Sequence, residues 1–410
     1  MANVSSSNGI EKQPKLRFPE FIDPWETTQL CNLFSKNTQK NSKGTVTNVI
    51  SNSAKNGLIP QRDYFDKDIA NADNTAGYYI ISKNDFVYNP RKSTDAPYGP
   101  ISRYTYDEDG IVSPLYLCFR GNNDVNPEYF ERFFKSSVWH RYIYMSGDSG
   151  ARHDRVSIKD ETFFEMPIHM PNNEEQKKIA AFLSLIEQKI ECQSALIENL
   201  KKYKRGVVKT LLDPKQNKRQ GVTWTTDTIG NLGTFIKGAA LSKADISDLG
   251  TPFILYGELY TTYKEVVRSI VRTTQASVDD VYLSRIGDVV IPTSGETPEE
   301  ISTASCIMVP NVILAGDLNI YRSTIVDGRI MSYLLNHIVN DQIARVAQGK
   351  SVVHVLASEI GKISITYPDH NEQERIAEIL ELIDNRIAVS EMSLNSMQEM
   401  KKALLQQLFI

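Results

Sequence analysis

The stretch "MPNNEEQKKIAAFLSLIEQKIECQSALIENLKKYKRGVVKTLL" (170–212) occurs in this chain a second time in altered form. Residues 367–409, "YPDHNEQERIAEILELIDNRIAVSEMSLNSMQEMKKALLQQLF", align with it without a gap, at an offset of 197. Both copies carry the pattern Glu-Gln-x-x-Ile-Ala, at 175–180 and at 372–377. A repeat at such a spacing predicts a tandem of two similar units.

The sequences that precede the two copies also correspond. "PWETTQLCNLF" from Pro24 and "TWTTDTIGNLG" from Thr223 match at Trp25 and Trp224, at Asn32 and Asn231, and at Leu33 and Leu232. Each unit therefore consists of a variable globular segment followed by a long helix.

Each copy of the repeat has apolar residues at steps of alternately four and three, which is the heptad pattern of a helix–helix seam. The apolar seam positions are Ile179, Leu183, Ile186, Ile190, Ile197 and Leu200 in the first copy, and Ile376, Leu380, Ile383, Ile387, Leu394 and Met397 in the second. Polar residues interrupt the seams at Gln193, Lys204, Ser390 and Lys401, where they can determine the register. The two stripes can pack on each other; in the alternative, each stripe packs on its own globular segment.

Composition excludes several classes of protein. With 410 residues, 41% apolar and 23% charged, the chain is long enough for more than one globular core. It has neither an apolar run long enough for a membrane helix nor an apolar segment for a secretory signal, so we expect a cytoplasmic protein without a membrane. The net charge of −4 means that any binding to nucleic acid must depend on local basic patches.

No catalytic or metal-binding pattern is present in the sequence. The four cysteines lack metal-ligand spacing and are expected to be reduced and buried, and the six histidines form no close pair. "ARVAQGKS" (344–351) resembles a phosphate loop, but such a loop requires a strand before it and a helix after it. Here a helical pattern precedes Gly349 and a strand-like pattern follows it, which argues against nucleotide binding. We predict no catalytic, cofactor-binding or metal-binding residues.

The globular segments are of mixed α/β character. "AGYYIISKNDFVYNP" (76–90) and "DGIVSPLYLCF" (109–119) are typical of strands and turns. "NPEYFERFFKSSVWHRYIYM" (126–145) is typical of a helix that Asn126 caps and Pro127 begins. Asn172 and Asn371 are the predicted caps of the two long helices.

The two-unit layout, the repeated Glu-Gln-x-x-Ile-Ala helices, the opening "LRFPEFIDPWE" (16–26) and segments such as "YNPRKSTDAPYGPISRY" (88–104) resemble the specificity subunits of type I restriction-modification enzymes. The resemblance implies an α/β fold in which two pseudo-symmetric target-recognition domains are separated by two long helices that form an antiparallel coiled coil. The implied division is a flexible N-terminus (1–15), recognition domain 1 (16–168), a central spacer helix (169–212), a linker (213–220), recognition domain 2 (221–366) and a C-terminal spacer helix (367–410).

The resemblance also implies the function and the partners. Each recognition domain would read one half of a bipartite site in double-stranded DNA, and two methyltransferase subunits would dock along the helices. A translocating restriction subunit is an optional further partner. The adenine-N6 methylation and its S-adenosylmethionine would belong to the methyltransferase partner, and this chain would be a non-catalytic subunit.

The residues that we expect to contact DNA are cations, aromatic residues and hydroxyl groups of the two globular segments. In the first segment they are Arg62, Arg91, Lys92, Ser93, Tyr98, Arg103, Tyr104, Arg152 and Arg155. In the second they are Lys237, Lys243, Tyr256, Tyr260, Tyr263, Lys264, Ser294, Glu296, Arg322, Lys350 and Ser351.

A second hypothesis is a coiled-coil adaptor whose globular halves bind proteins. The two hypotheses differ in what a loss of cations would do. Replacement of Arg91 and Arg152 by alanine would weaken DNA binding only if the chain reads DNA.

Overall fold

The computed structural model describes residues 13–61, 75–147, 154–217, 219–347, 349 and 353–410, and the chain divides into two compact units. Unit 1 comprises Met1–Ser194 and Ser393–Ile410, and unit 2 comprises Ala195–Met392. Both boundaries fall within long helices, α5 (Asn173–Leu212) and α12 (His370–Gln407). Each long helix therefore contributes one part to unit 1 and the other part to unit 2. The sequence analysis instead predicted spacer helices that are separate from the two domains.

Unit 1 contains ten short strands and four short helices besides its parts of α5 and α12, counted over the residues that the structure describes. The strands are β1 (Glu26–Gln29), β2 (Phe34–Lys36), β3 (Ile50–Ser53), β4 (Gly57–Pro60), β5 (Tyr79–Ile81), β6 (Phe86–Tyr88), β7 (Ile101–Arg103), β8 (Gly110–Val112), β9 (Leu117–Gly121) and β10 (Pro167–Met170). The helices are α1 (Leu30–Leu33), α2 (Pro127–Lys135), α3 (His140–Ser146) and α4 (Asp160–Phe164).

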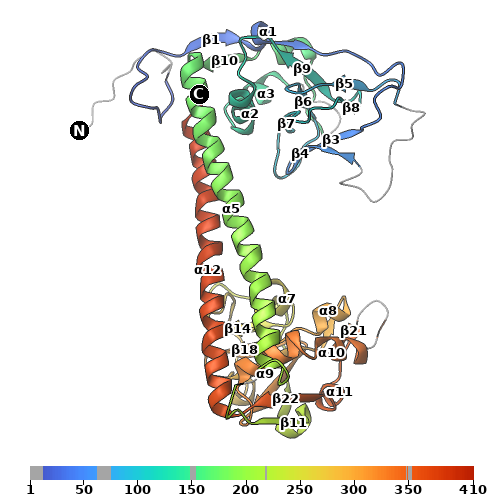
Figure 1. The fold of residues 1–410 in the computed structure, drawn as a ribbon, viewed down its shortest axis with the longest axis vertical. Helices are drawn as coiled ribbons and strands as arrows, with labels where there is room; N and C mark the ends of the chain where they lie inside the picture. Colours follow the sequence, from blue (N-terminus) through green and yellow to red (C-terminus); the bar gives the residue numbers. More distant parts are fainter. Residues whose placement is uncertain (1–12, 62–74, 148–153, 218, 348, 350–352) are drawn as a thin grey trace. The chain divides into compact units, whose positions relative to one another are not determined.

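The core of unit 1 lies between a four-stranded antiparallel sheet, in the order β2-β9-β6-β7, and the helices that cover it (Figure 1). Aromatic rings dominate this core: Phe34 contacts Phe86, Phe119 and Phe130 edge to face, with ring centroids 5.1–5.4 Å apart. Such pairs add to the stability that burial alone provides. Two further strand pairs, β3–β4 and β5–β8, complete the domain.

The end of the chain closes the core of unit 1. Leu405, Leu408 and Phe409 are buried in the same cluster as Ile179 and Leu183 of α5. The C-terminal part of α12 thus packs antiparallel on the first part of α5, as the shared cluster and the chain directions require (Figure 1). Residues about 220 positions apart complete one core.

Unit 2 has twelve strands and several short helices in its described part. The strands are β11 (Trp224–Thr228), β12 (Gly233–Lys237), β13 (Thr251–Leu255), β14 (Val266–Val267), β15 (Thr273–Thr274), β16 (Asp288–Pro292), β17 (Ser294–Gly295), β18 (Ser305–Ile307), β19 (Ile313–Ala315), β20 (Leu318–Ser323), β21 (Val353–His354) and β22 (Ser364–Pro368). The helices are α6 (Ile229–Leu232), α7 (Glu258–Thr261), α8 (Pro298–Ile301), α9 (Gly328–His337), α10 (Asn340–Val346) and α11 (Ala357–Gly361), with 3-10 turns at Lys243–Asp245 and Asp280–Tyr282.

A five-stranded mixed sheet, in the order β12-β20-β16-β18-β14, forms the centre of unit 2. One of its faces packs on α9 and on both long helices, where Val208 and Leu212 of α5 are buried with Ile376 and Leu380 of α12. The arrangement of α5 and α12 here is the counterpart of that in unit 1. The mixed α/β class, the repeated domains and the long helices are therefore as the sequence predicted.

The predicted seam residues face the interior of their units. All twelve are buried or half-buried, and none is exposed. Seven of them belong to clusters that also contain residues of the other helix and of a globular domain: Ile179, Leu183, Ile186 and Ile190 of α5, and Ile376, Leu380 and Ile383 of α12. At these positions the apolar stripes pack on both at once, so the two packing alternatives are not exclusive.

The repeated Glu-Gln pair anchors the start of each helix. The amide of Gln176 donates to the carbonyl of Pro171 (2.9 Å), and Gln373 donates to Pro368 (2.8 Å). Glu175 accepts from Arg17, whereas Glu372 accepts from Arg219 and Arg375. All four side chains are buried, so the signature has a structural role at the junction of strand and helix.

The strands before the two helices are also equivalent. β1 pairs antiparallel with β10, and β11 pairs antiparallel with β22. The predicted domain boundaries at 168 and 366 therefore fall inside strands β10 and β22. Asn172 caps α5 through the backbone N–H of Glu175, as predicted, but Asp369 caps α12. The prediction for Asn371 was wrong because the helix begins at His370 and so already includes Asn371.

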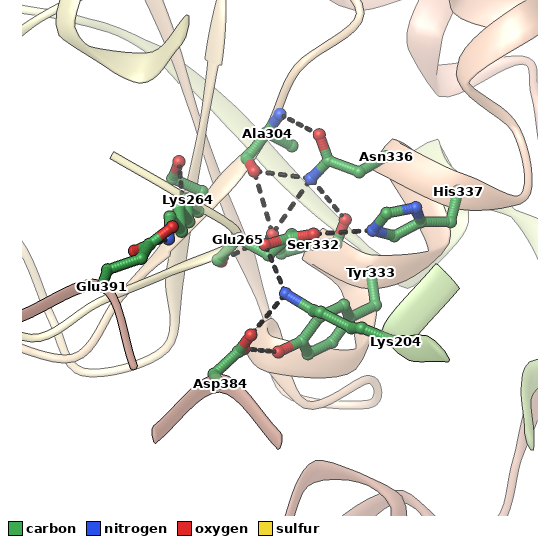
Figure 2. Close-up of polar contacts among 11 residues, drawn as sticks. Lys204, Lys264, Glu265, Ala304, Ser332, Tyr333, Asn336, His337, Asp384 and Glu391 are labelled. Carbon is green, nitrogen blue, oxygen red and sulfur yellow. Dashed lines mark hydrogen bonds and ion pairs between the residues drawn. The ribbon is translucent and has the colours of Figure 1, made fainter. Parts of the chain in front are cut away.

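Lys204, a polar residue in the seam of α5, lies in a network of charged groups in unit 2 (Figure 2). Its ammonium contacts Asp384 of α12 (2.6 Å) and Glu265 (2.8 Å), and lies 5.0 Å from the centre of the Tyr333 ring. His337 donates to the other oxygen of Glu265 (2.7 Å). This network ties α5, α12, α9 and the strand region of the domain together.

An equivalent ion pair exists in unit 1. Lys401 of α12 contacts Glu187 of α5 (2.8 Å), and these residues lie 197 positions from Lys204 and Asp384 respectively. Glu187 also accepts from Arg132 of α2 (2.6 Å). The two seam lysines thus take part, in both units, in ion-pair networks that join the two helices to a globular domain.

Three local predictions can be compared with the structure. Asn126 caps α2 and Pro127 begins it, but the predicted helix over 126–145 is broken between α2 and α3, where Ser136 has an extended backbone. The four cysteines are free, yet Cys31 and Cys192 are exposed, so the prediction that they are buried was wrong for these two. α10 precedes Gly349 and β21 follows it, the order opposite to that of a phosphate loop.

None of the helices in the described residues is long and apolar enough to cross a membrane.

Candidate nucleic-acid interface

A cavity of about 520 Å³ in unit 1 brings together four of the residues predicted to contact DNA. Arg91, Lys92, Ser93 and Arg155 line it, although the last lies more than sixty residues from the others along the chain. Its wall also contains Lys55, at the turn of the β3–β4 hairpin, and, among the described residues, one acidic side chain, Asp95. The surplus of cations suits a polyanion.

Backbone pairing holds the two basic segments of this cavity together. Lys92 donates its N–H to the carbonyl of Asp154, and Val156 donates to Pro90 (both 2.8 Å), so Arg91 and Arg155 form a β-bridge. Beneath them, the buried amide of Asn52 donates to the carbonyl of Val87 (2.8 Å). The arginines are thereby fixed at their backbones while their side chains remain outside the core.

Asn52, Lys55 and Tyr116 line the same cavity but were not predicted. Burial raises the pKa of Tyr116, and the charges of Arg91 and Arg155 lower it only in part. Its hydroxyl is therefore protonated at neutral pH and can donate as well as accept. Lys55 carried no signal in the sequence beyond its charge, because its place in the cavity depends on the pairing of β3 with β4.

The other predicted residues of the first domain are not in this cavity. Arg103 is held by Glu131 (2.8 Å) and Asn84 (2.9 Å), and Tyr104 is fully buried with its hydroxyl on the carbonyl of Glu108. Both are structural residues, because a buried or paired side chain has no free group to offer a nucleic acid. Tyr98 is half-buried against His140, 4.9 Å between ring centroids. Arg62 and Arg152 lie outside the described residues.

In unit 2, a cavity of about 770 Å³ contains Lys243, Tyr256 and Tyr260 from the predicted set. Tyr256 precedes α7 and Tyr260 lies within it, with ring centroids 6.4 Å apart. Burial and the neighbouring Tyr256 and Glu300 raise the pKa of Tyr260, so its hydroxyl is neutral. Arg272 at the cavity wall pairs with the buried Glu258 (2.7 Å). This cavity is more aromatic and less cationic than that of unit 1.

Several predicted residues of the second domain have other partners. The guanidinium of Arg322 donates hydrogen bonds to the carboxylate of Asp288 and to the carbonyl of Leu283. Arg322 therefore has a structural role. Lys264 pairs with Glu391 of α12 (2.9 Å). Tyr263 is half-buried, and its hydroxyl accepts from the N–H of Val271.

The remaining predictions fall at one end of the sheet or beyond the described residues. Ser294 is buried and donates to Asp317 (3.0 Å), whereas the nearby Glu296 is exposed. Lys237 is exposed beside a different cavity, described below. Lys350 and Ser351 lie outside the part of the chain that the structure describes.

Each recognition domain therefore offers a polar cavity with cations and neutral tyrosine hydroxyls. Such groups can contact phosphates, base edges and base faces. Among the described residues, no group of three or more histidine, cysteine or acidic side chains is placed to hold a metal ion.

The repeated architecture has a match among known families. Residues 24–202 and 221–398 both match the type I restriction modification DNA specificity domain. The chain belongs to this family. It is a DNA sequence-specificity subunit of a type I restriction-modification system, and it contributes specificity and not catalysis.

Solved structures share this fold. A chain from a study of complex assembly and conformational transition of the type I R-M system superposes with a TM-score of 0.60 at 14% identity, covering 95% of this chain and 99% of that one. The S subunit of a type I restriction-modification system from M. genitalium superposes with a TM-score of 0.55 at 16% identity, covering 97% and 99%. No curated protein matches the specificity subunit.

Proposed function

We propose that each recognition domain of this specificity subunit reads one half of a bipartite site in duplex DNA through its own cavity. The observation that supports this most is that three of the predicted contact residues, Arg91, Lys92 and Arg155, line one cavity. The adenine-N6 methyltransferase activity and its S-adenosylmethionine belong to partner subunits, and a translocating restriction subunit is an optional further partner.

Substitution of cations in one cavity is expected to affect one half of the site only. Arg91→Ala/Lys92→Ala should weaken binding to all duplexes and reduce base preference in one half of the site. The slope of log binding constant against log salt concentration should become shallower by about one unit per cation removed. Lys243→Ala should erode preference in the other half. Selection of bound sequences from randomised duplexes, with the full chain and its own methyltransferase subunits, measures both effects.

The matched control is Lys83→Ala, an exposed lysine of unit 1 that pairs with Asp107 and lies outside the cavity. It should leave binding and base preference unchanged. If the cavity variants bind DNA as the wild type does, the adaptor hypothesis is favoured. If each variant disturbs both halves equally, the assignment of one half to each domain is wrong.

We also propose that the methyltransferase subunits dock on apolar residues at the outer face of the long helices. In unit 2, Tyr203 of α5 and Leu382, Val389 and Met392 of α12 have between 61 and 71% of their surface exposed. In unit 1, Leu185 of α5 is 64% exposed. Exposed apolar rows of this kind are typical of surfaces that receive a partner helix.

The repeat supports a pair of equivalent docking surfaces. Leu185 corresponds to Leu382 and Tyr203 to Met400 at the offset of 197, and all four are exposed. Duplicated surfaces suit two copies of one partner.

Leu382→Glu is expected to weaken association with the methyltransferase subunit roughly tenfold or more, because it places a charge in an apolar interface. The fold should not change, since this side chain is largely exposed. Co-purification and titration with the co-expressed partner measure the loss, and Leu382→Met, which keeps the apolar contact, should bind normally. Wild-type association of Leu382→Glu would exclude this surface.

A further inference from the structure

Unit 2 contains another cavity, of about 530 Å³, at one end of its central sheet. Its lining includes Lys237, Thr293, Asp317, Asn319, His354 and Leu356. Asp317 lies between this cavity and that of Tyr256 and Tyr260, because it lines both. The cavity therefore adjoins the one that contains the proposed DNA contacts Lys243, Tyr256 and Tyr260.

Asn319, the second residue of β20, lies at this end of the sheet and lines the cavity. In β20 it lies opposite Lys237 of β12 and Ile291 of β16, so the three side chains share one face. Its neighbours Leu318 and Ile320 are buried in the core on the other face. The pairing of strands thus places an amide and a flexible cation side by side.

The side-chain amide of Asn319 is buried but has an unpaired N–H donor. The residue is only 6% exposed, and its Nδ2 has no hydrogen-bond partner among the described residues. A buried donor without a partner lowers stability, and most such groups in proteins are satisfied. Because the Asn319 side chain lines the cavity, a turn of its amide would bring this donor to a ligand bound there.

The rim of the cavity adds complementary chemistry. Leu356, immediately before α11, has 64% of its surface exposed, and His354 and Lys237 are also exposed. An exposed leucine beside a lysine and a histidine offers an apolar contact within a polar, partly cationic surface.

These groups match one base pair in the major groove of DNA. An asparagine amide can pair with N6 and N7 of adenine, and an apolar side chain can contact the methyl group of thymine. The terminal torsion of asparagine has a broad energy minimum, so the amide can turn towards a base edge without strain. Lys237 is placed for an adjacent phosphate.

We propose that Asn319 and Leu356 are specificity-determining residues that recognise an A·T pair in the half-site of recognition domain 2. This inference rests on the proposed reading of DNA by that domain. It assigns a base pair to a cavity that the sequence analysis did not identify, apart from Lys237 at its edge.

The test is Asn319→Leu in the full chain with its methyltransferase subunits, assayed by selection from randomised duplexes. We expect preference for A·T to fall roughly tenfold or more at one position of one half-site, with the other positions unchanged. The melting temperature should stay the same or rise, because an apolar side chain of similar size replaces an unpaired polar group. A merely structural asparagine would give the opposite, a lower melting temperature.

Two companion variants sharpen the result. Leu356→Ala should weaken preference at the same position, and Lys237→Gln should lower affinity for all sequences without altering base preference. If the wild type selects no sequence at all, the proposed function fails. If the wild type selects a site and Asn319→Leu selects the same one with equal preference, or a G·C pair occupies the affected position, only the role of Asn319 is overturned.

Discussion

Glu265→Ala is expected to destabilise unit 2 by about 3–5 kcal/mol, the usual cost of breaking a buried ion pair by removing one partner. Lys204 is only 6% exposed and would keep Asp384 as its sole carboxylate partner in the network of Figure 2. His337 would also lose its acceptor. Because the two units need not unfold together, hydrogen exchange in α9 and in residues 195–212 is the appropriate measurement.

The matched control is Glu381→Ala, which removes an acidic residue of α12 that pairs with the exposed Arg268 (2.7 Å). A surface pair of this kind contributes about 0–1 kcal/mol. Equal losses of protection in the two variants would show that the Lys204 network does not stabilise unit 2.

The same network predicts a pH dependence. Burial raises the pKa of Glu265, but the hydrogen bond from His337 and the charge of Lys204 outweigh it and lower the pKa from 4.5 to about 2. Since the folded pKa is depressed, the stabilisation is present above pH 4.5 and is lost as the pH falls from 4.5 towards 2. It amounts to about 3 kcal/mol, and the difference between wild type and Glu265→Ala should shrink over this range.

Phe409→Ala is expected to destabilise unit 1 by about 3–5 kcal/mol, the usual cost of truncating a buried phenylalanine. This residue is 2% exposed and contacts Tyr129 and Phe133 of α2, at ring-centroid distances of 5.3 and 6.0 Å. Although it stands next to the end of the chain, it fills the core of the domain that begins the chain. Loss of protection from exchange should therefore appear in α2 and not in α9.

The reciprocal variant is Leu212→Ala, at the equivalent position of the first helix. Leu212 is 1% exposed in the core of unit 2, and its truncation should cost about 2–5 kcal/mol there. Met400→Ala, at a half-exposed position of α12, is the control with a small effect. The opposite result would be that Leu212→Ala weakens unit 1 and Phe409→Ala weakens unit 2. Each helix end would then stabilise the domain that precedes it in the sequence, and the packing described here would be disproved.

The DNA-contact predictions show where sequence reasoning is limited. Arg91 and Arg155 were proposed as contacts and line one cavity, whereas Arg103 and Arg322 were proposed on the same grounds and are paired with Glu131 and Asp288. Charge and residue type are identical in both groups. The difference arises from acidic partners 28 and 34 residues away, whose positions depend on strand and helix packing.

The residues that the sequence analysis missed also depend on contacts with distant parts of the chain. Asn319 lies between two buried apolar residues of β20, and its unpaired Nδ2 and its place in a cavity distinguish it. Glu265 lies 61 residues from Lys204, and its role depends on the approach of α5 to the domain. Neither has a periodic or local signal in the sequence.

The sequence by itself determined the duplication, the two long helices, the phase of their seams and the family. These properties follow from residues at regular spacing along one segment, since helical periodicity and a repeat are visible without knowledge of contacts. Only the tertiary structure decided which cations remain free, which tyrosines are buried and which helix end completes which domain. These depend on contacts between segments up to the full length of the chain apart, and such contacts are set by packing of the whole core.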